Sequence, residues 1–301
     1  MRANTPSMYV LACPCILDPS LRARGITRDA DRAAFFLALE RCRKFGIEAV
    51  PLPCPETRYL GKDRKPGTFL ERLNTPEFRS LQQDLAEAVR KIIAERGSPL
   101  CIIGVDSSPS CGVTATHFGT VGGSSPKRPG RGSFLSLLAD IPAIDVKIFA
   151  RYRIYLAAPL FSEAERTYNR DLGTFLTGHY FEVFLPQDAG DDSSSRTENA
   201  NRELFEKDLA ALRAADLVVA VIDGADADSG TAWEMGYAFS LGKPVIAIRT
   251  DFRMAGHHER VNLMLEMSSV VVGSKTELLG ALLPLEEPGV PAFSGKVPDY
   301  K

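Results

Sequence analysis

The carboxylate of Glu234 lies in the stretch DADSGTAWEMGYAFSLGKP, residues 226–244, where the pattern predicts a helix over about 230–241. Burying an unpaired carboxylate is costly, so this glutamate either faces solvent or has a function. Asp228 lies six residues earlier, and Asp216 opens the preceding apolar run. Carboxylates at one crevice suit cleavage of a glycosidic bond, because one can attack the sugar carbon while another group handles the leaving group's proton. The alternative is a solvated helix residue behind turn-forming aspartates.

The turn that precedes this helix contributes hydrogen-bond donors. Ser229 and Gly230 start the helix, so free backbone N–H groups face the same crevice. Gly230 and Gly236 flank Glu234 and leave room for a ligand. Gly230 is therefore a candidate substrate-binding residue, whereas we expect Trp233 to pack in the core.

Three short polar motifs contain cysteines: C-P-C-I-L-D-P at 13–19, L-P-C-P-E at 52–56 and D-S-S-P-S-C-G at 106–112. Each motif follows a strand-like run, so we expect the three thiols to converge on one edge of a sheet. Three thiolates can hold zinc with an open position, or a 4Fe–4S cluster with one iron unligated by protein. The absence of a CxxC pair disfavours zinc, and three unligated thiols remain an alternative. The candidate ligands are Cys15, Cys54 and Cys111.

The remaining cysteines receive a different interpretation. Cys42 lies in a predicted helix and Cys101 in a predicted strand, so both are expected to be buried apolar residues. Cys13 ends the first strand, and its role is ambiguous. All six cysteines precede residue 112, which indicates that the two halves of the chain do different chemistry.

The composition is that of an ordinary globular protein, with 45% apolar and 25% charged residues. A length of 301 residues suits two domains, since domains average about 150 residues. The net charge of −2 gives no reason to expect nucleic acid or an anionic membrane as a partner. The chain lacks a membrane-length apolar run and a signal-peptide pattern, so we expect it in the cytoplasm, where cysteines stay reduced.

Strands alternate with helices in both halves, which predicts two α/β domains with parallel sheets. We expect domains over 1–148 and 152–285 and a tail over 286–301. The stretch 119–133 is expected to be a mobile surface loop, and the alternative is a lid or a phosphate contact. The second domain is predicted to be a doubly wound, Rossmann- or flavodoxin-like sheet, in which ligands bind beyond the carboxyl ends of the strands. Its five predicted strands are 153–159, 180–186, 216–223, 244–250 and 268–273.

The second half resembles the nucleoside 2-deoxyribosyltransferases over about 152–285, through RIYLAAPLFSEAE, ADLVVAVIDGADADSGTAWEMGYAFSLGKPVIAI and VNLMLE. The resemblance implies a covalent deoxyribosyl-enzyme that a second base intercepts, and it implies a homo-oligomer. It also implies residue roles: Glu234 as nucleophile, Tyr155 orienting it, Asp216 serving the proton of the base, Asp228 holding a sugar hydroxyl, and Asn262 completing a neighbouring subunit's site.

The first half resembles the thiouracil desulfidases over about 8–120, through C-I-L-D-P-S-L-R-A-R-G, P-C-P-E and G-V-D-S-S-P-S-C-G. The resemblance implies a 4Fe–4S cluster held by Cys15, Cys54 and Cys111, with an open iron for the sulfur of a thiolated base. Glu56 and Ser108 occupy positions that could move protons there. The sequence departs from the family pattern at Asp18 and in the extra Cys13.

Together these expectations describe a bifunctional enzyme for salvage or clearance of modified nucleosides. The second domain would release or exchange a base, and the first would remove sulfur from a thiolated base. Two alternatives stay open for the second domain. One is a nucleoside 5′-monophosphate N-glycosidase, in which Ser162, Ser229 and the serines of 193–195 could contact the phosphate. The other is a non-catalytic nucleotide sensor, in which Glu234 would affect affinity only.

Overall fold

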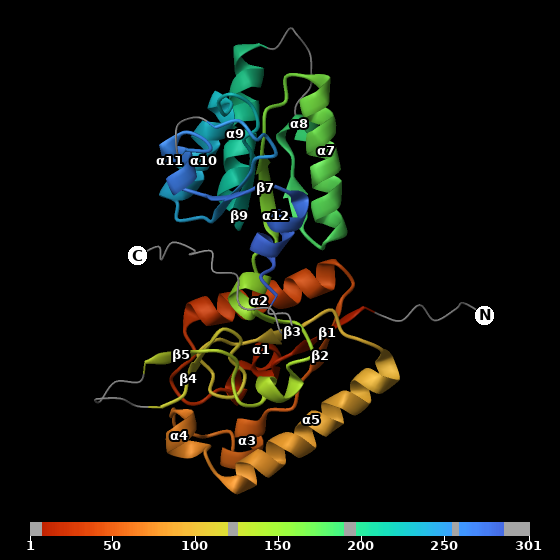
Figure 1. The fold of residues 1–301 in the computed structure, drawn as a ribbon, viewed down its shortest axis with the longest axis vertical. Helices are drawn as coiled ribbons and strands as arrows, with labels where there is room; N and C mark the ends of the chain where they lie inside the picture. Colours follow the sequence, from red (N-terminus) through yellow and green to blue (C-terminus); the bar gives the residue numbers. More distant parts are fainter. Residues whose placement is uncertain (1–7, 120–125, 190–196, 255–258, 286–301) are drawn as a thin grey trace, which may run out of the picture. The chain divides into compact units, whose positions relative to one another are not determined.

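The computed structural model describes residues 8–119, 126–189, 197–254 and 259–285. The chain divides between Ala150 and Arg151 into two compact units, and each contains a parallel sheet (Figure 1). The mixed α/β class predicted from the sequence is confirmed. In the described part of the chain, no helix combines the length and apolarity needed to cross a membrane.

The N-terminal unit is built on a four-stranded parallel sheet with the order β2-β1-β3-β6. The central strand β1 is buried along its whole length, and Leu11 lies opposite Ile102 of β3 in the parallel register. Such fully apolar strands are typical of sheets covered on both faces. The strands are β1 (Tyr9–Ala12), β2 (Glu48–Pro51), β3 (Ile102–Gly104) and β6 (Ala143–Asp145).

Helices of very different length surround this sheet (Figure 1). The longest, α5, begins at Pro76 behind the cap Thr75, whose hydroxyl accepts a hydrogen bond from the Phe78 N–H at 3.1 Å. It ends at Arg96, and the next residue, Gly97, has a φ of 85°, which favours glycine. The helices are α1 (Pro14–Leu17), α2 (Asp29–Lys44), α3 (Pro55–Leu60), α4 (Phe69–Arg72), α5 (Pro76–Arg96) and α6 (Val146–Phe149), with 3₁₀ turns η1 (Pro19–Leu21) and η2 (Leu135–Leu138).

The stretch 119–133, expected to be a surface loop, is partly a hairpin. Within it, β5 (Lys127–Pro129) pairs antiparallel with β4 (Ala115–His117), while residues 120–125 lie outside the described part of the chain. The guanidinium of Arg128 lies 4.6 Å from the centre of the Phe118 ring. The prediction missed this hairpin because a three-residue strand rich in charge and proline has no apolar alternation to reveal it.

The C-terminal unit is a five-stranded parallel sheet with the order β11-β10-β9-β7-β8. The chain first adds β8 on one side of β7 and then β9, β10 and β11 on the other, so the strand order reverses between β7 and β9. Ligands of doubly wound sheets bind at such a switch point, beyond the carboxyl ends of the strands. The strands are β7 (Arg153–Ala157), β8 (Glu182–Phe184), β9 (Leu217–Val221), β10 (Val245–Ile248) and β11 (Val270–Val272).

All five strands predicted for this unit are present, and the helix predicted over about 230–241 is also present, over Ser229–Ser240. Helix α7 begins behind Ser162, whose hydroxyl accepts a hydrogen bond from the Glu165 N–H while the Glu165 carboxylate accepts one from the Ser162 N–H. This capping box fixes the loop that follows β7. The helices are α7 (Glu163–Gly178), α8 (Pro186–Ala189), α9 (Glu198–Ala214), α10 (Ser229–Ser240), α11 (Leu263–Met267) and α12 (Lys275–Leu282).

Candidate functional site

Glu234 of α10 and Tyr155 of β7 form a hydrogen-bonded pair at the switch point. The Tyr155 hydroxyl donates to Oε1 of Glu234 at 2.5 Å. Tyr155 is fully buried, and Phe184 of β8 stacks on its ring at 5.5 Å between centroids. The phenol is therefore held by packing and orients one carboxylate oxygen of Glu234. The structure thus brings these two predicted site residues together.

The environment of Glu234 shifts its pKa upward. Burial is the largest cause and raises the pKa to about 7, although the hydrogen bond from Tyr155 lowers it. The charges of Asp208 and Asp228 add to the increase. A carboxylate whose pKa lies near neutral pH, at a switch point, is typical of a catalytic group.

Asp208 on α9 is a member of this site that sequence reasoning missed. Leu212 of the same helix packs in the core cluster that contains Tyr155. Burial is the largest cause of the raised pKa of both Glu234 and Tyr155, and the charge of Asp208 raises both further. Asp208 precedes Leu212 by four residues, and Leu212 is only 1% exposed. Residues four apart share a helix face. The spacing of Asp208 from an apolar leucine could therefore have indicated that Asp208 lies on the buried face of the helix.

Asp216 does not lie with Glu234, and the expectation that it lines the same crevice is corrected. It immediately precedes β9 and binds the start of β7, where its carboxylate accepts hydrogen bonds from the Tyr152 and Arg153 N–H groups at 3.1 and 2.9 Å. The Arg153 guanidinium pairs with it at 2.6 Å. Because the strands are parallel, a residue that opens β9 lies at the opposite edge of the sheet from the start of α10. Asp216 therefore links the start of β9 to the start of β7 and has a structural role there.

Asp228 and Gly230 shape the entry to α10. Asp228 caps the helix, and its Oδ2 accepts hydrogen bonds from the N–H and hydroxyl of Thr231 at 3.0 and 3.3 Å. A Cβ at Gly230 would lie 3.1 Å from the same Oδ2, so glycine keeps this carboxylate uncrowded. Asp228 is close enough to raise the pKa of Glu234, and its contact with a sugar hydroxyl stays a prediction.

Trp233 and Asn262 both lie at the surface. Trp233 is 52% exposed and stacks on Tyr237 at 5.2 Å between centroids, so the expectation of core packing was wrong. Neighbouring residues of a helix are rotated by about 100° about its axis. Because Glu234 faces the strands, Trp233 points outward. Asn262 is exposed and caps α11, its Oδ1 accepting a hydrogen bond from the Met264 N–H at 3.0 Å. A contact between Asn262 and a neighbouring subunit's site stays a prediction.

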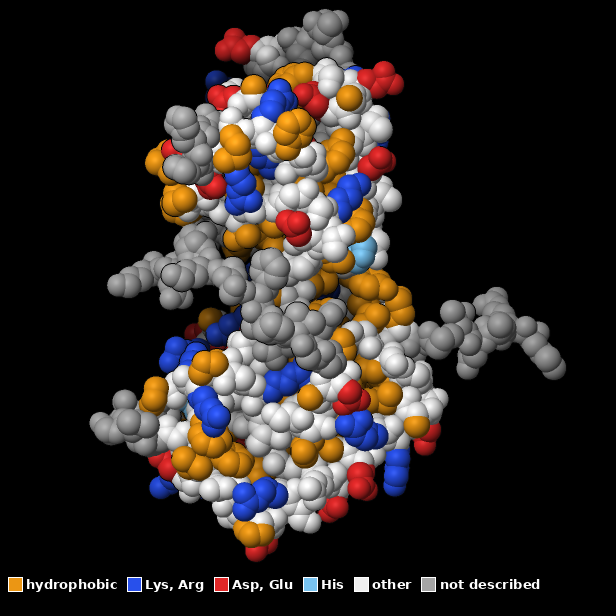
Figure 2. All heavy atoms as spheres, viewed as in Figure 1, with side chains coloured by type: hydrophobic (Ala, Val, Ile, Leu, Met, Phe, Trp, Pro, Cys, Tyr) orange, Lys and Arg blue, Asp and Glu red, His pale blue; other side chains and the backbone are white. Residues whose placement is uncertain are grey.

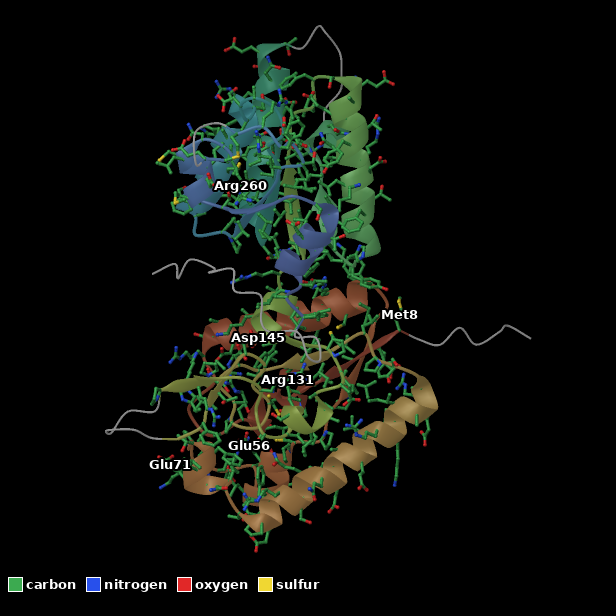
Figure 3. The ribbon with its side chains drawn as sticks, in the orientation of Figure 1. Met8, Glu56, Glu71, Arg131, Asp145 and Arg260 are labelled. Atoms are coloured by element: carbon green, nitrogen blue, oxygen red, sulfur yellow. The ribbon has the colours of Figure 1, made fainter. Side chains whose placement is uncertain are left out.

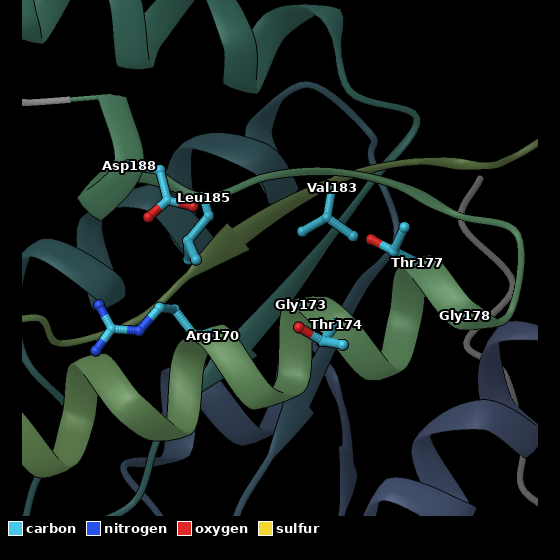
Figure 4. A pocket seen from close by; sticks show the side chains of 8 residues that line it. All are labelled: Arg170, Gly173, Thr174, Thr177, Gly178, Val183, Leu185 and Asp188. Carbon is cyan, nitrogen blue, oxygen red and sulfur yellow. The ribbon is translucent and has the colours of Figure 1, made fainter.

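A shallow pocket of about 570 Å³ lies beside α7 and β8 (Figure 4). Val183 and Leu185 line it, whereas Phe184 packs on Tyr155. Successive strand residues point to opposite faces of a sheet, so this pocket lies on the face away from the Tyr155–Glu234 pair. It is therefore separate from the candidate active site.

Comparison with known proteins decides the class of this domain. Residues 154–267, which include Tyr155, Asp208 and Glu234, match the family model for nucleoside 2-deoxyribosyltransferase. The C-terminal region carries a nucleoside 2-deoxyribosyltransferase domain. This deoxyribosyltransferase domain contains the switch-point pair described above.

Individual relatives match over part of the chain. An uncharacterized protein of Ureaplasma parvum is 28% identical over 125 residues, covering 37% of this chain and 78% of the relative. An uncharacterized protein of Methanocaldococcus jannaschii is 32% identical over 98 residues, covering 31% of this chain and 62% of the relative, which is less than two thirds. The solved 2-deoxyribosyltransferase of Bacillus psychrosaccharolyticus is 25% identical with a TM-score of 0.38, covering 46% of this chain and 99% of that chain.

The N-terminal unit brings the three predicted cysteine ligands to one edge of its sheet. Cys15 lies in α1 after β1, Cys54 caps α3 after β2, and Cys111 follows β3. Burial raises the pKa of Cys15, and the charges of Cys111 and Cys54 raise it further. Such mutual effects require the three thiols to be within electrostatic range of one another.

Glu56 and Ser108 lie in this cysteine site as predicted, and Glu56 is labelled in Figure 3. The Ser108 hydroxyl donates to Oε1 of Glu56 at 3.2 Å and accepts a hydrogen bond from the Cys111 N–H at 3.1 Å. Arg64 pairs with the other oxygen of Glu56 at 3.3 Å. The serine and the glutamate thus form a hydrogen-bonded pair beside the thiols. Their role in moving protons stays a prediction.

Cys13 also belongs to this group of thiols, whereas Cys42 and Cys101 do not. Cys13 is fully buried; the Cys111 side chain lowers its pKa, but burial and the charges of Cys15 and Cys54 raise the pKa above the usual value. Cys42 and Cys101 are 3% and 5% exposed, which confirms their predicted burial. Asp18, the other departure from the family pattern, caps η1 through a hydrogen bond from the Ser20 N–H at 3.0 Å.

Cys15, Cys54 and Cys111 are the thiols that an iron–sulfur cluster would use here, and the cluster itself stays a prediction. Among the described residues, no group of three or more His, Cys, Asp or Glu side chains has the geometry to hold an ion. A cluster takes each thiolate at a different iron, so its ligands stand further apart than those of one ion. The sulfur of Cys54 already accepts hydrogen bonds from the Thr57 N–H and hydroxyl at 3.3 and 3.1 Å, as metal-bound thiolates commonly do.

Proposed function

We propose that the C-terminal domain transfers the deoxyribosyl group of a nucleoside from one base to another through a covalent intermediate on Glu234. The observation that carries this proposal is the buried Tyr155–Glu234 hydrogen bond at the switch point. A Glu234 oxygen bonds to C1′ of the sugar as the glycosidic C–N bond breaks, and the bonding electron pair stays on the base nitrogen. An incoming base then attacks C1′ and releases Glu234. If water attacks instead, the reaction is hydrolysis.

Asp208 is the acid that we assign to the leaving base. The departing nitrogen needs a proton, and Asp208 is the carboxyl group on α9 whose charge acts on both Glu234 and Tyr155. Asp208 takes up a proton when the nucleoside binds, gives it to the leaving base, and recovers one from the incoming base. We do not assign this role to Asp216, because it pairs with Arg153 at the other edge of the sheet.

We also propose that the domain works as a homo-oligomer. Apolar side chains gather at the surface in the region of α10 and α11 (Figure 2). Large exposed apolar areas commonly mark protein interfaces, and Asn262 caps α11 within this area. The exposed residues are Phe239 (44%), Leu263 (50%), Met264 (75%) and Met267 (66%).

For the N-terminal domain we propose removal of sulfur from a thiolated nucleobase, with Cys15, Cys54 and Cys111 holding a 4Fe–4S cluster. The described cysteines are all free thiols, as this role and a reducing cytoplasm require. When bound, the cluster supplies a Lewis-acidic iron with affinity for sulfur. The carbon–sulfur bond breaks, water supplies the new oxygen, and sulfur leaves as sulfide. Ser108 and Glu56, hydrogen-bonded at 3.2 Å, transfer the proton of that water.

The joined domains fit one sequence of reactions, in which a thiolated base is released from deoxyribose and then loses its sulfur. The test uses anaerobically purified protein, 4-thio-2′-deoxyuridine and excess adenine, with products separated by chromatography. Deoxyadenosine together with uracil and sulfide supports both activities. Deoxyadenosine with intact thiouracil supports the transferase alone, and free base without deoxyadenosine indicates a hydrolase. Ligand that binds but is not consumed would indicate a sensor.

A further inference from the structure

Thr57 links the sulfur of Cys54 to a buried cation. Its N–H and its hydroxyl both lie within hydrogen-bond distance of the Cys54 sulfur, at 3.3 and 3.1 Å. The same hydroxyl oxygen accepts a hydrogen bond from Nη1 of Arg64 at 3.0 Å. Thr57 therefore lies between the guanidinium and the sulfur.

Arg64 is positioned by contacts on several sides. The residue is 7% exposed. Its Nε donates to Oε2 of Glu56 at 3.3 Å, and its Nη1 also lies 3.4 Å from the Gly61 carbonyl oxygen. A buried guanidinium is always charged, so Arg64 neutralises Glu56 and at the same time polarises the Thr57 hydroxyl.

The single proton of the Thr57 hydroxyl has two acceptors within reach. One is the Leu21 carbonyl oxygen at 3.3 Å and the other is the Cys54 sulfur at 3.1 Å. Arg64 occupies an acceptor position of the hydroxyl oxygen, so it leaves the proton available to donate. When Cys54 is a thiolate, its charge makes it the stronger acceptor, and the proton turns toward sulfur.

We propose that Thr57, polarised by Arg64, is a positioning residue whose hydroxyl hydrogen-bonds the Cys54 sulfur and stabilises an iron–sulfur cluster bound there. This inference rests on the proposed cluster of the N-terminal domain. Hydrogen bonds to ligand sulfurs draw negative charge from the cluster and raise its reduction potential. Groups that support metal ligands in this way typically change metal affinity by about 10- to 100-fold.

The experiment compares wild type with Thr57→Val and Thr57→Ser, each reconstituted anaerobically with iron and sulfide. Iron and sulfide content, the rate of iron release to a chelator, and the midpoint potential are measured. Thr57→Val keeps the shape of the side chain and the backbone N–H but loses the hydroxyl. We expect it to release iron at least about 10-fold faster and to have a more negative potential, and we expect Thr57→Ser to restore both values.

A control separates this effect from a general loss of stability. Thr75 caps α5 in the same domain through its hydroxyl. Thr75→Val therefore also removes a threonine hydroxyl, but one that does not contact the sulfur of Cys54. We expect Thr75→Val to lower the melting temperature and leave iron release and potential unchanged.

The possible failures are distinguishable. Wild type that binds no iron–sulfur cluster would overturn the proposed desulfidase function and this inference with it. Wild type that binds a cluster, with Thr57→Val matching it in iron release and potential, would overturn the inference alone. Equal effects of Thr57→Val and Thr75→Val would reduce Thr57 to a structural role.

Discussion

The Tyr155 hydroxyl donates a hydrogen bond to Oε1 of Glu234 at 2.5 Å, although 79 residues of sequence separate the two. Tyr155 belongs to β7 and Glu234 to the helix that follows β9, so the contact exists because β7 and β9 are neighbours in the sheet. The pair gives Glu234 one fixed oxygen and leaves the other for a ligand. The predictions for the C-terminal domain follow from this arrangement.

Glu234→Gln is expected to abolish base exchange. The amide is nearly the same size but cannot form the glycosyl ester, so the rate should fall by at least about 1000-fold. Initial rates of deoxyadenosine formation measure it. Glu203→Gln, at an exposed position of α9, is the matched control and should keep the wild-type rate. Retention of more than a tenth of the wild-type rate in Glu234→Gln would exclude Glu234 as the nucleophile.

Activity is expected to depend on pH through Glu234. The carboxylate is the reactive form, so kcat/KM should rise with pH and pass its midpoint at about 7. The Tyr155 hydrogen bond lowers the pKa of Glu234, so Tyr155→Phe should move the midpoint to higher pH. It should also lower kcat/KM by roughly 10- to 100-fold, as expected for loss of a hydrogen bond to a charged group. A midpoint that stays in place in Tyr155→Phe would contradict this coupling.

Two aspartates that are eight residues apart should give opposite results when changed to asparagine. Asp208→Asn should lower the rate of base exchange by about 100-fold or more, because it removes the proton donor, with little change in melting temperature. Asp216→Asn should keep the rate but lower the free energy of unfolding by about 1–3 kcal/mol, because it breaks the pair with Arg153. Rates and thermal denaturation curves of both variants test the assignment. The reverse pattern would restore Asp216 as the catalytic residue.

The cysteine site is testable through iron content. Cys15→Ser, Cys54→Ser and Cys111→Ser are each expected to lose most of the iron after anaerobic reconstitution, since each removes a thiolate ligand. Cys42→Ser is the matched control, because Cys42 is buried in α2 and outside the site. Iron and sulfide assays with visible absorption spectra provide the measurement. Equal iron in all four variants would show that these thiols hold no cluster.

The sheet of the C-terminal domain could be predicted because its strands are nearly pure apolar runs. Residues 216–223 read as one strand, and β9 covers Leu217–Val221 with every residue buried. The position of Asp216 could also have been predicted from the strand. A residue that opens a parallel strand lies at the amino ends of the strands, whereas the crevice lies at their carboxyl ends. Asp208 was harder to predict, because its partner groups come from β7 and α10 and only the folded chain brings them together.

In the N-terminal domain, too, some features could be predicted from the sequence and others could not. Its cysteine motifs could be located because each follows a strand of one parallel sheet, whereas α3 and α4 were missed. These helices have six and four residues, too few to reveal a helical period. The contact from Arg64 to Thr57 could not be predicted either, because it depends on how the loop after α3 folds back on that short helix.

The most direct test of the central claim is intact-protein mass spectrometry of the enzyme, quenched rapidly in acid after mixing with a 2′-deoxynucleoside and no acceptor base. We predict an added mass equal to one deoxyribosyl group, located by peptide mapping at Glu234 and absent from Glu234→Gln. The adduct should disappear when adenine is added before the quench, as deoxyadenosine forms. If the enzyme exchanges bases but never carries the adduct, or if the adduct lies on another residue, the account is contradicted.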